Sequence, residues 1–151
     1  MRTIKFRGRD ADDGEWLYGD LRQRMGYFPT IIEPYCDDED KVAYREIAVE
    51  EKTVGQFTNM KDKKDQEIYD GDILFVEFSD KSGGYYFVGW NEKTASWGIM
   101  DAYSYQALQE GYDFPEFKNY LLLAFLEKAI IFEVAGNSYD NPELLELRKK
   151  N

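Results

Sequence analysis

The segment from Thr53 to Leu74 constrains the fold more than any other stretch, because it reads as two strands joined by a polar turn. Its first residues are prone to β-structure. Residues 61–66 are all polar or charged, so they cannot be buried and predict a hairpin turn at the surface. Residues 67–69 return to apolar character, and Asp70-Gly71-Asp72 combines residue types that favour a turn. We therefore expect a β-hairpin followed by a second turn that begins another strand.

The next two predicted strands are apolar on both faces. In residues 73–78, Leu74, Val76 and Phe78 alternate with Ile73 and Phe75, and residues 85–90 repeat the pattern. A strand that is apolar on both faces is buried on both faces. We therefore predict a mainly β fold, a small barrel-like antiparallel structure whose outer surface is covered by another segment or another subunit. That cover should extend over Ile73, Phe75, Tyr85 and Phe87.

Alternating apolar residues predict further strands along the chain. Aromatic residues make up 17% of the sequence, and they favour sheets. The additional strands are expected at 3–8, 15–21, 25–33, 42–49, 97–100 and 129–134.

Two short helices complete the predicted fold. Apolar residues at helical spacing predict a helix over about 116–127, with Pro115 suited to its first turn. The tail predicts a C-terminal helix over about 142–149, because Asn141 can cap it and Pro142 fits the first helical position.

The length of 151 residues favours one domain. Within residues 1–151 we distinguish an N-terminal hairpin region (1–50), a central β core (51–101) and a C-terminal helix, strand and helix (103–151).

Three stretches resemble the YopX family, which occurs mainly in phages, prophages and related mobile elements. They are Ile4–Arg7, Phe57–Leu74 and Glu133–Leu145, so the resemblance runs in order through nearly the whole chain. The resemblance implies a β-rich, oligomeric architecture. The motif residues that it marks as structural are Phe6, Arg7, Gly55, Phe57, Asp62, Ile68, Tyr69, Gly71, Asp72, Gly136, Asn137, Tyr139, Asn141 and Pro142.

The central motif departs from the family at two places. Where the family carries Asn-Gly this chain has Lys64-Asp65, and where the family carries Thr-Gly it has Thr58-Asn59. Both changes remove a glycine, which disfavours a tight type I′ turn. We therefore expect a looser hairpin tip or a different turn type.

The formal net charge of −11 argues against non-specific binding to nucleic acid or anionic lipid. Cys36 is the only cysteine, so no disulfide can form within the chain. The N-terminus lacks the apolar core of a signal peptide, and no apolar run approaches the ~20 residues of a membrane span. These features predict a cytoplasmic protein, in a bacterial host if the family resemblance holds, that does not bind membranes.

Catalytic and metal chemistry find little support in the sequence. Histidine is absent, which removes the usual general base and the commonest metal ligand. The acidic turn at 10–14 lacks calcium-loop spacing, and the acidic run at 37–40 reads as a solvated loop. Asp70 and Asp72 flank Gly71 and are close enough in sequence to share a site. We therefore predict no catalytic, cofactor-binding or metal-binding residue, and no cofactor.

The sequence thus favours a non-enzymatic, self-assembling protein-interaction module that forms a homo-oligomer and binds a protein partner. The alternative is a nucleic-acid-associated regulator that stacks single strands on Tyr and Trp. The net charge of −11 disfavours this alternative. In addition, the Lys and Arg residues are scattered along the chain, apart from Arg22, Arg24 and the tail. A carboxylate-based enzyme is the third reading.

Overall fold

A computed structural model describes residues 1–111 and 120–146. The contacts within the chain divide it into two compact units, Met1–Asn59 and Met60–Asn151. Both units are built mainly from antiparallel strands, which confirms the predicted fold class. The boundary between the units lies within the central motif. The sequence did not indicate a division there.

Unit 1 is an antiparallel sheet with the strand order β4-β3-β2-β1-β5. A small core of Leu17, Ile31 and Val49 is buried on one of its faces. The strands are β1 (Phe6–Arg9), β2 (Trp16–Arg22), β3 (Thr30–Cys36), β4 (Val42–Ala48) and β5 (Gly55–Lys61), with a 3₁₀ turn, η1 (Glu51–Thr53), before β5.

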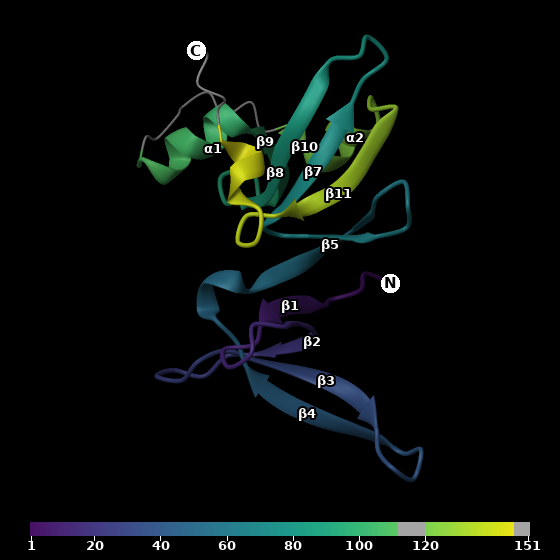
Figure 1. Cartoon of the computed structure of the whole chain (residues 1–151), viewed down its shortest axis with the longest axis vertical. Coiled ribbons are helices and arrows are strands. Elements are labelled where there is room, and N and C mark those ends of the chain that lie inside the picture. Colours follow the sequence, from purple (N-terminus) through teal and green to yellow (C-terminus); the bar gives the residue numbers. More distant parts are fainter. Residues whose placement is uncertain (112–119, 147–151) are drawn as a thin grey trace. The chain divides into compact units, whose positions relative to one another are not determined.

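The far half of the β3–β4 hairpin extends beyond the sheet as a two-stranded ribbon. β2 pairs with β3 only from Thr30 to Ile32, whereas β3 pairs with β4 along its whole length. Figure 1 shows these two strands as a long hairpin whose turn points away from β1 and β2. The sequence placed one strand at 25–33, but β3 begins at Thr30, after a seven-residue loop between β2 and β3.

Unit 2 contains a second antiparallel sheet, with the order β10-β9-β8-β7-β11. The end of β5 enters this unit and returns through the predicted polar turn into β6 (Glu67–Tyr69). The other elements are β7 (Asp72–Glu77), β8 (Gly83–Asn91), β9 (Ser96–Asp101), α1 (Ala102–Gln109), β10 (Tyr120–Leu121), α2 (Leu122–Leu126), β11 (Ile131–Asn137) and a 3₁₀ helix, η2 (Pro142–Leu145).

Both faces of the unit 2 sheet carry apolar side chains, as predicted. One face packs on α2 in the main core, which contains Leu74, Val76, Val88, Phe125 and Leu126. The other face is covered at one end by α1 and η2. Ile73 is fully buried there, and the ring of Phe87 lies 4.6 Å from that of Tyr105 in α1. Phe75 is half-buried, and Tyr85 keeps 40% of its surface exposed.

Three details of the prediction need correction. No closed barrel forms among the described strands, because a helical layer, rather than barrel closure, covers the second face. The helix expected at 116–127 is not helical at Tyr120–Leu121, which pairs with β9, and α2 spans only Leu122–Leu126. The rest of that segment, 112–119, lies outside the described residues.

The C-terminal helix is also shorter than expected. It is a 3₁₀ helix over Pro142–Leu145, and Glu146 is already extended. Gln106 of α1 donates a hydrogen bond to the Leu145 carbonyl (3.2 Å), which holds the buried end of η2. Residues 147–149 lie outside the described part. No described helix is both long and apolar enough to cross a bilayer.

Candidate interaction site

The motif residues of unit 1 lie where β1 meets β5. Arg7 pairs with Gly55, and Phe6 pairs with Gln56. The Phe57 amide continues the contact by donating to the Lys5 carbonyl (2.8 Å). The guanidinium of Arg7 is buried and lies 4.8 Å from the ring centre of Trp16. These residues join β1 to β5, which are the first and last strands of unit 1 along the chain.

In unit 2 the central and C-terminal motifs come together. Asn137 of β11 pairs with Asp72 of β7, and the Ser138 amide donates to the Gly71 carbonyl (2.9 Å). Gly71 has a φ of +87°, in the region that favours glycine. The buried Asp72 carboxylate accepts the Tyr69 amide (2.7 Å), which holds the turn that begins β7. Ile68 is fully buried in the adjacent core.

The loop after β11 explains the remaining motif residues. The Asn137 side-chain oxygen accepts the amides of Tyr139 (3.0 Å) and Asp140 (2.9 Å). A Cβ at Gly136 would lie 2.2 Å from the Asn141 side-chain oxygen, so this position has room only for glycine. Pro142 begins η2 as predicted, but Asn141 does not cap it with its side chain. Its oxygen instead lies 3.4 Å from the Asn137 amide.

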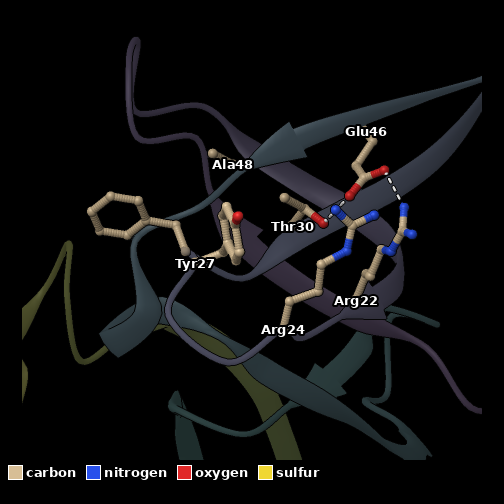
Figure 2. Close-up of a pocket in the computed structure, with 7 residues that line it drawn as sticks. Arg22, Arg24, Tyr27, Thr30, Glu46 and Ala48 are labelled. Carbon is tan, nitrogen blue, oxygen red and sulfur yellow. Dashed lines mark hydrogen bonds and ion pairs between the residues drawn. The ribbon is translucent and has the colours of Figure 1, made fainter.

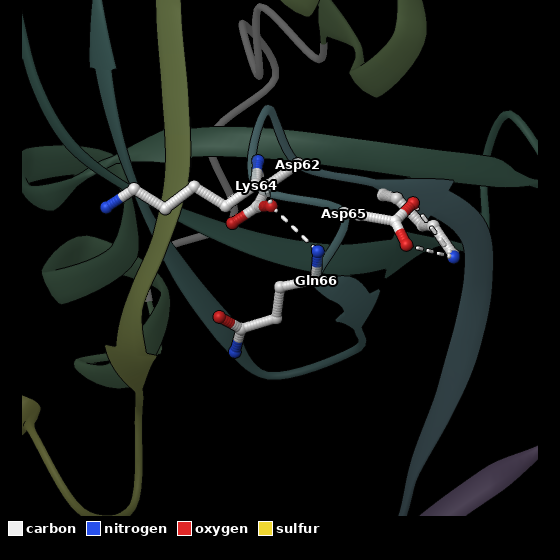
Figure 3. Close-up of polar contacts among 5 residues, drawn as sticks. Asp62, Lys64, Asp65 and Gln66 are labelled. Atoms are coloured by element: carbon white, nitrogen blue, oxygen red, sulfur yellow. Dashed lines mark hydrogen bonds and ion pairs between the residues drawn. The ribbon is translucent and has the colours of Figure 1, made fainter.

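Asp62 anchors the polar turn to the edge of β11. Its buried carboxylate accepts the amides of Lys64 (2.8 Å) and Gln66 (2.9 Å) within the turn, and that of Val134 (2.9 Å) from β11. The Lys63 amide donates to the Phe132 carbonyl (3.2 Å). Figure 3 shows the Asp62 carboxylate directed into the turn, while Lys64 extends across β11. The outer edge of β11 is therefore covered.

An ion pair reinforces this cover. Lys64 lies 2.5 Å from Glu133 of β11, and its hydrogen bond with Glu133 raises the pKa of Lys64. The two positions that lost a glycine both keep a left-handed backbone, with a φ of +64° at Asn59 and +67° at Asp65. Since type I′ needs positive φ at both central residues, the hairpin tip has a different turn type, as the sequence predicted.

The outer edge of β4 is open. The Val49 amide bonds inward to Pro29 (2.9 Å), whereas the Ala48 carbonyl accepts the Ala11 amide (3.1 Å) from outside. Antiparallel pairing alternates strictly along a strand. The backbone groups of Val42, Tyr44 and Glu46 therefore point away from β3. None of these outward groups has a backbone partner within residues 1–111 and 120–146.

The opposite edge of the same hairpin is protected. Pro34 lies opposite Tyr44, and its missing N–H would point away from β4, on the side where the pairing of β3 with β2 has already stopped at Ile32. A proline at this position prevents another strand from pairing along that side of β3. β4 carries no comparable device, and Val42 and Tyr44 are 63% and 70% exposed.

A pocket of about 220 Å³ opens beside this edge. Glu46 lines it and is bonded to the Thr30 hydroxyl (2.8 Å) and to Arg22 (2.7 Å). The Thr30 hydroxyl, and then Arg22, lower the pKa of Glu46, so this carboxylate is ionised at neutral pH. Figure 2 shows Arg22 and Arg24 side by side next to Glu46. Tyr27, Phe28 and Ala48 complete the lining.

The rim of the pocket joins a cation to exposed aromatic rings. Tyr27 and Phe28 are 75% and 74% exposed. The Arg24 side chain makes no hydrogen bond or ion pair with any residue that the structure describes. A guanidinium beside exposed rings can bind an anionic or planar group.

The sequence identified the motif residues but missed this site. Its only signals were Arg22, Arg24 and the alternating segment 42–49, and neither reveals which side of a strand stays unpaired. No cluster of three potential metal ligands occurs among the described residues. Of the two carboxylates that flank Gly71, Asp70 is half-buried and Asp72 is buried. The Asp72 carboxylate accepts a hydrogen bond from the Tyr69 amide.

One comparison with known proteins agrees with the motifs. A family model described as YopX protein matches residues 5–146. The crystal structure of protein EF1440 from Enterococcus faecalis aligns with a TM-score of 0.48 and 18% identity, over 97% of this chain and 100% of that chain. No curated protein matches the sequence. Because the family model covers almost the entire sequence, the chain belongs to the YopX family.

Proposed function

We propose that the protein is a non-enzymatic interaction module that binds an extended segment of a partner protein along β4. The observation that supports this most directly is the open edge, where the backbone groups of Val42, Tyr44 and Glu46 have no backbone partner among the residues that the structure describes. An edge of this kind pairs readily with another strand. Natural proteins usually block such edges, as Pro34 and the Asp62 turn do here.

Two substitutions at one position test this proposal. Tyr44→Pro removes an outward N–H without breaking a bond to β3, whereas Tyr44→Thr keeps the N–H and removes only the ring. A partner captured from lysogenic cells should be retained by the wild type and by Tyr44→Thr, and lost with Tyr44→Pro. A partner retained equally by both variants would show that β4 does not bind it by strand addition.

We further propose that the protein self-associates through unit 2. Phe75 and Tyr85 pack ring against ring (5.6 Å between ring centres), and Ile131, which lies opposite Glu77 on the neighbouring strand β11, is 39% exposed. Such a patch suits a second copy of the same surface. Light scattering should find an oligomer that Tyr85→Ser weakens and Tyr103→Ser, at an exposed position on α1, does not. A strict monomer at tens of micromolar would end this part of the proposal.

A second candidate function is favoured by the pocket. Arg24, Tyr27 and Phe28 combine the two features with which proteins bind single-stranded nucleic acids: a cation that binds phosphate and rings that stack on bases. A shift assay with a labelled oligonucleotide at low salt tests it. Binding that Arg24→Glu abolishes would favour this candidate, and no binding at low salt would remove it. The net charge of −11 places it second.

The cellular setting follows from the family. We propose an accessory role in a phage or mobile element, in the bacterial cytoplasm. A carboxylate-based enzyme is the weakest candidate, because the buried carboxylates of Asp62 and Asp72 already accept backbone amides.

A further inference from the structure

We infer that the segment bound along β4 is basic at both ends and apolar in its middle. This inference rests on the proposed strand addition at that edge and adds the chemistry of the occupant. It follows from three features of unit 1: the length of the open stretch, the side chains along it and the charges at its ends.

The open stretch has room for a short strand. It runs from Val42 to Glu46, five residues or about 17 Å. Beyond Glu46 the edge is already occupied, because the Ala11 amide bonds to the Ala48 carbonyl. At the other end the chain turns into the loop between β3 and β4. An incoming segment therefore pairs over about five residues.

One face of the stretch carries exposed apolar side chains. Val42 and Tyr44 lie on one face of β4, and both are more than half exposed. Side chains of an added strand on the same face would lie directly beside them. Apolar or β-branched residues at alternate positions of the ligand would cover these two side chains.

An acidic turn lies beyond each end of the stretch, although Arg22 and Arg24 lie beside Glu46 at one of these ends. The turn between β3 and β4 carries Asp37, Asp38, Glu39 and Asp40, and its only cation, Lys41, pairs with Glu39 (2.5 Å). The turn that occupies the edge at Ala48 contains Asp10, Asp12 and Asp13. Cationic residues at either end of the added strand would face these carboxylates, whichever direction it runs.

The same charges disfavour a second copy of β4 as the occupant. Antiparallel pairing of two β4 edges would bring the acidic 37–40 turn of one copy to the Asp10–Asp13 turn of the other. Like charges so placed oppose association. Self-association is therefore assigned to unit 2, and the β4 edge to a basic partner segment.

Three labelled peptides test the inference by fluorescence polarisation. The first is Lys-Lys-Val-Thr-Val-Thr-Val-Lys-Lys, the second replaces each Lys by Glu, and the third is the basic peptide with N-methylated backbone at alternate residues. The basic peptide should bind roughly tenfold or more tightly than the acidic one. The methylated peptide should not bind, because it cannot pair with the edge.

Charge-neutral variants of the protein complete the test. The triple variant Asp12→Asn, Asp38→Asn and Asp40→Asn keeps the turns, since none of these side chains accepts a hydrogen bond that holds them, unlike Asp10 and Asp37. It should bind the basic peptide roughly fivefold more weakly. Its matched control changes three exposed acids of unit 2 by the same total charge: Glu92→Gln, Glu110→Gln and Glu127→Gln.

The outcomes separate the two proposals. Equal binding of basic and acidic peptides, lost with Tyr44→Pro, would overturn the charge preference and keep strand addition. Binding of the basic peptide that survives both Tyr44→Pro and backbone methylation would overturn both. A wild-type dimer that Tyr44→Pro dissociates and Tyr44→Thr does not would make the second copy the occupant and overturn the inference. No binding at millimolar peptide would also overturn it.

Discussion

The two sheets treat their edge strands in opposite ways. In unit 2 the outer groups of Phe132 and Val134 are bonded by the turn that carries Asp62. In unit 1 the outer groups of Tyr44 and Glu46 meet no backbone partner in the described part of the chain. Because an uncovered edge is an aggregation hazard, a cover is expected wherever the edge has no use. The contrast therefore points to β4 as the edge kept open for binding.

The cover of β11 also explains why the central motif contains Asp62. Asp62 lies within a surface turn, yet it is buried because it holds three amides from two segments 72 residues apart. A charged residue in that place acts as a staple between the hairpin and the sheet. The residues of the central motif thus have structural roles, and the binding edge proposed above does not include them.

Proline substitution at both edges gives the largest expected contrast. Val134→Pro removes an amide that Asp62 accepts, and should cost about 3 kcal/mol of unfolding free energy or more. Tyr44→Pro removes an amide that points to solvent, and should cost less than about 1 kcal/mol. Urea unfolding of both variants measures the difference. Equal losses would mean that the β4 edge is as fully engaged as that of β11.

Removal of the staple itself should have a somewhat smaller effect. Asp62→Ala leaves three amides without their acceptor and should destabilise the fold by about 2–3 kcal/mol. Asp65→Asn in the same turn is the control, because the Asp65 carboxylate pairs only with exposed Lys61 and asparagine tolerates the positive φ there; it should change stability by about 0.5 kcal/mol or less. An Asp62→Ala variant as stable as this control would remove the staple from the account.

The sequence predicted most strands of this fold, because alternation and turn chemistry are local. In residues 73–78 and 85–90, the apolar pattern predicted both the strands and the burial of their two faces. It missed α1, whose cap is Asp101: the Ser104 amide donates to that carboxylate (2.8 Å). The short segment Ala102–Gln109 has no strong apolar period, so this helix depends on its Asp101 cap and on its packing against β8, β9 and η2.

The candidate site could not be predicted in the same way. Whether an edge is open depends on strand order and register, which no local pattern contains. Tyr44 and Val134 look alike as residues of an alternating strand, yet one amide is exposed and the other bonded. The segment 42–49 was identified as a strand, but its position at the end of the sheet required the structure.

The turn that covers β11 offers a stabilising change. Asp65 has a φ of +67°, and glycine adopts this region without strain. Asp65→Gly should therefore stabilise the fold by about 0.5–1 kcal/mol, even with the loss of the exposed Lys61 pair. Asn59→Gly, at a similar φ, is the control: it loses two bonds to Thr3 (2.8 and 2.9 Å) and should not stabilise. Thermal melts of both variants distinguish strain at the turn from a general glycine effect.

The smallest expected effect concerns Glu46, beside the open edge. Thr30 and Arg22 lower its pKa in the folded state, so its ionised form contributes stability that is fully present above the ordinary value of 4.5. That contribution is lost as the pH falls through the lowered pKa. Because the pair is exposed and screened, the stability difference between the wild type and Glu46→Gln should be small at pH ~7. It should shrink further towards pH ~3, because the wild-type carboxylate is then protonated.

Urea midpoints at the two pH values, with Glu15→Gln as the charge-matched control, measure this dependence. Glu15 is an exposed acid outside the pocket. A difference that stays constant or grows on acidification would contradict the role of Thr30 and Arg22. In that case the Glu46 carboxylate would not be held in the pocket, and the rim beside β4 would present two unpaired arginines. Such a rim would favour a nucleic acid over a basic peptide as the natural ligand of this face.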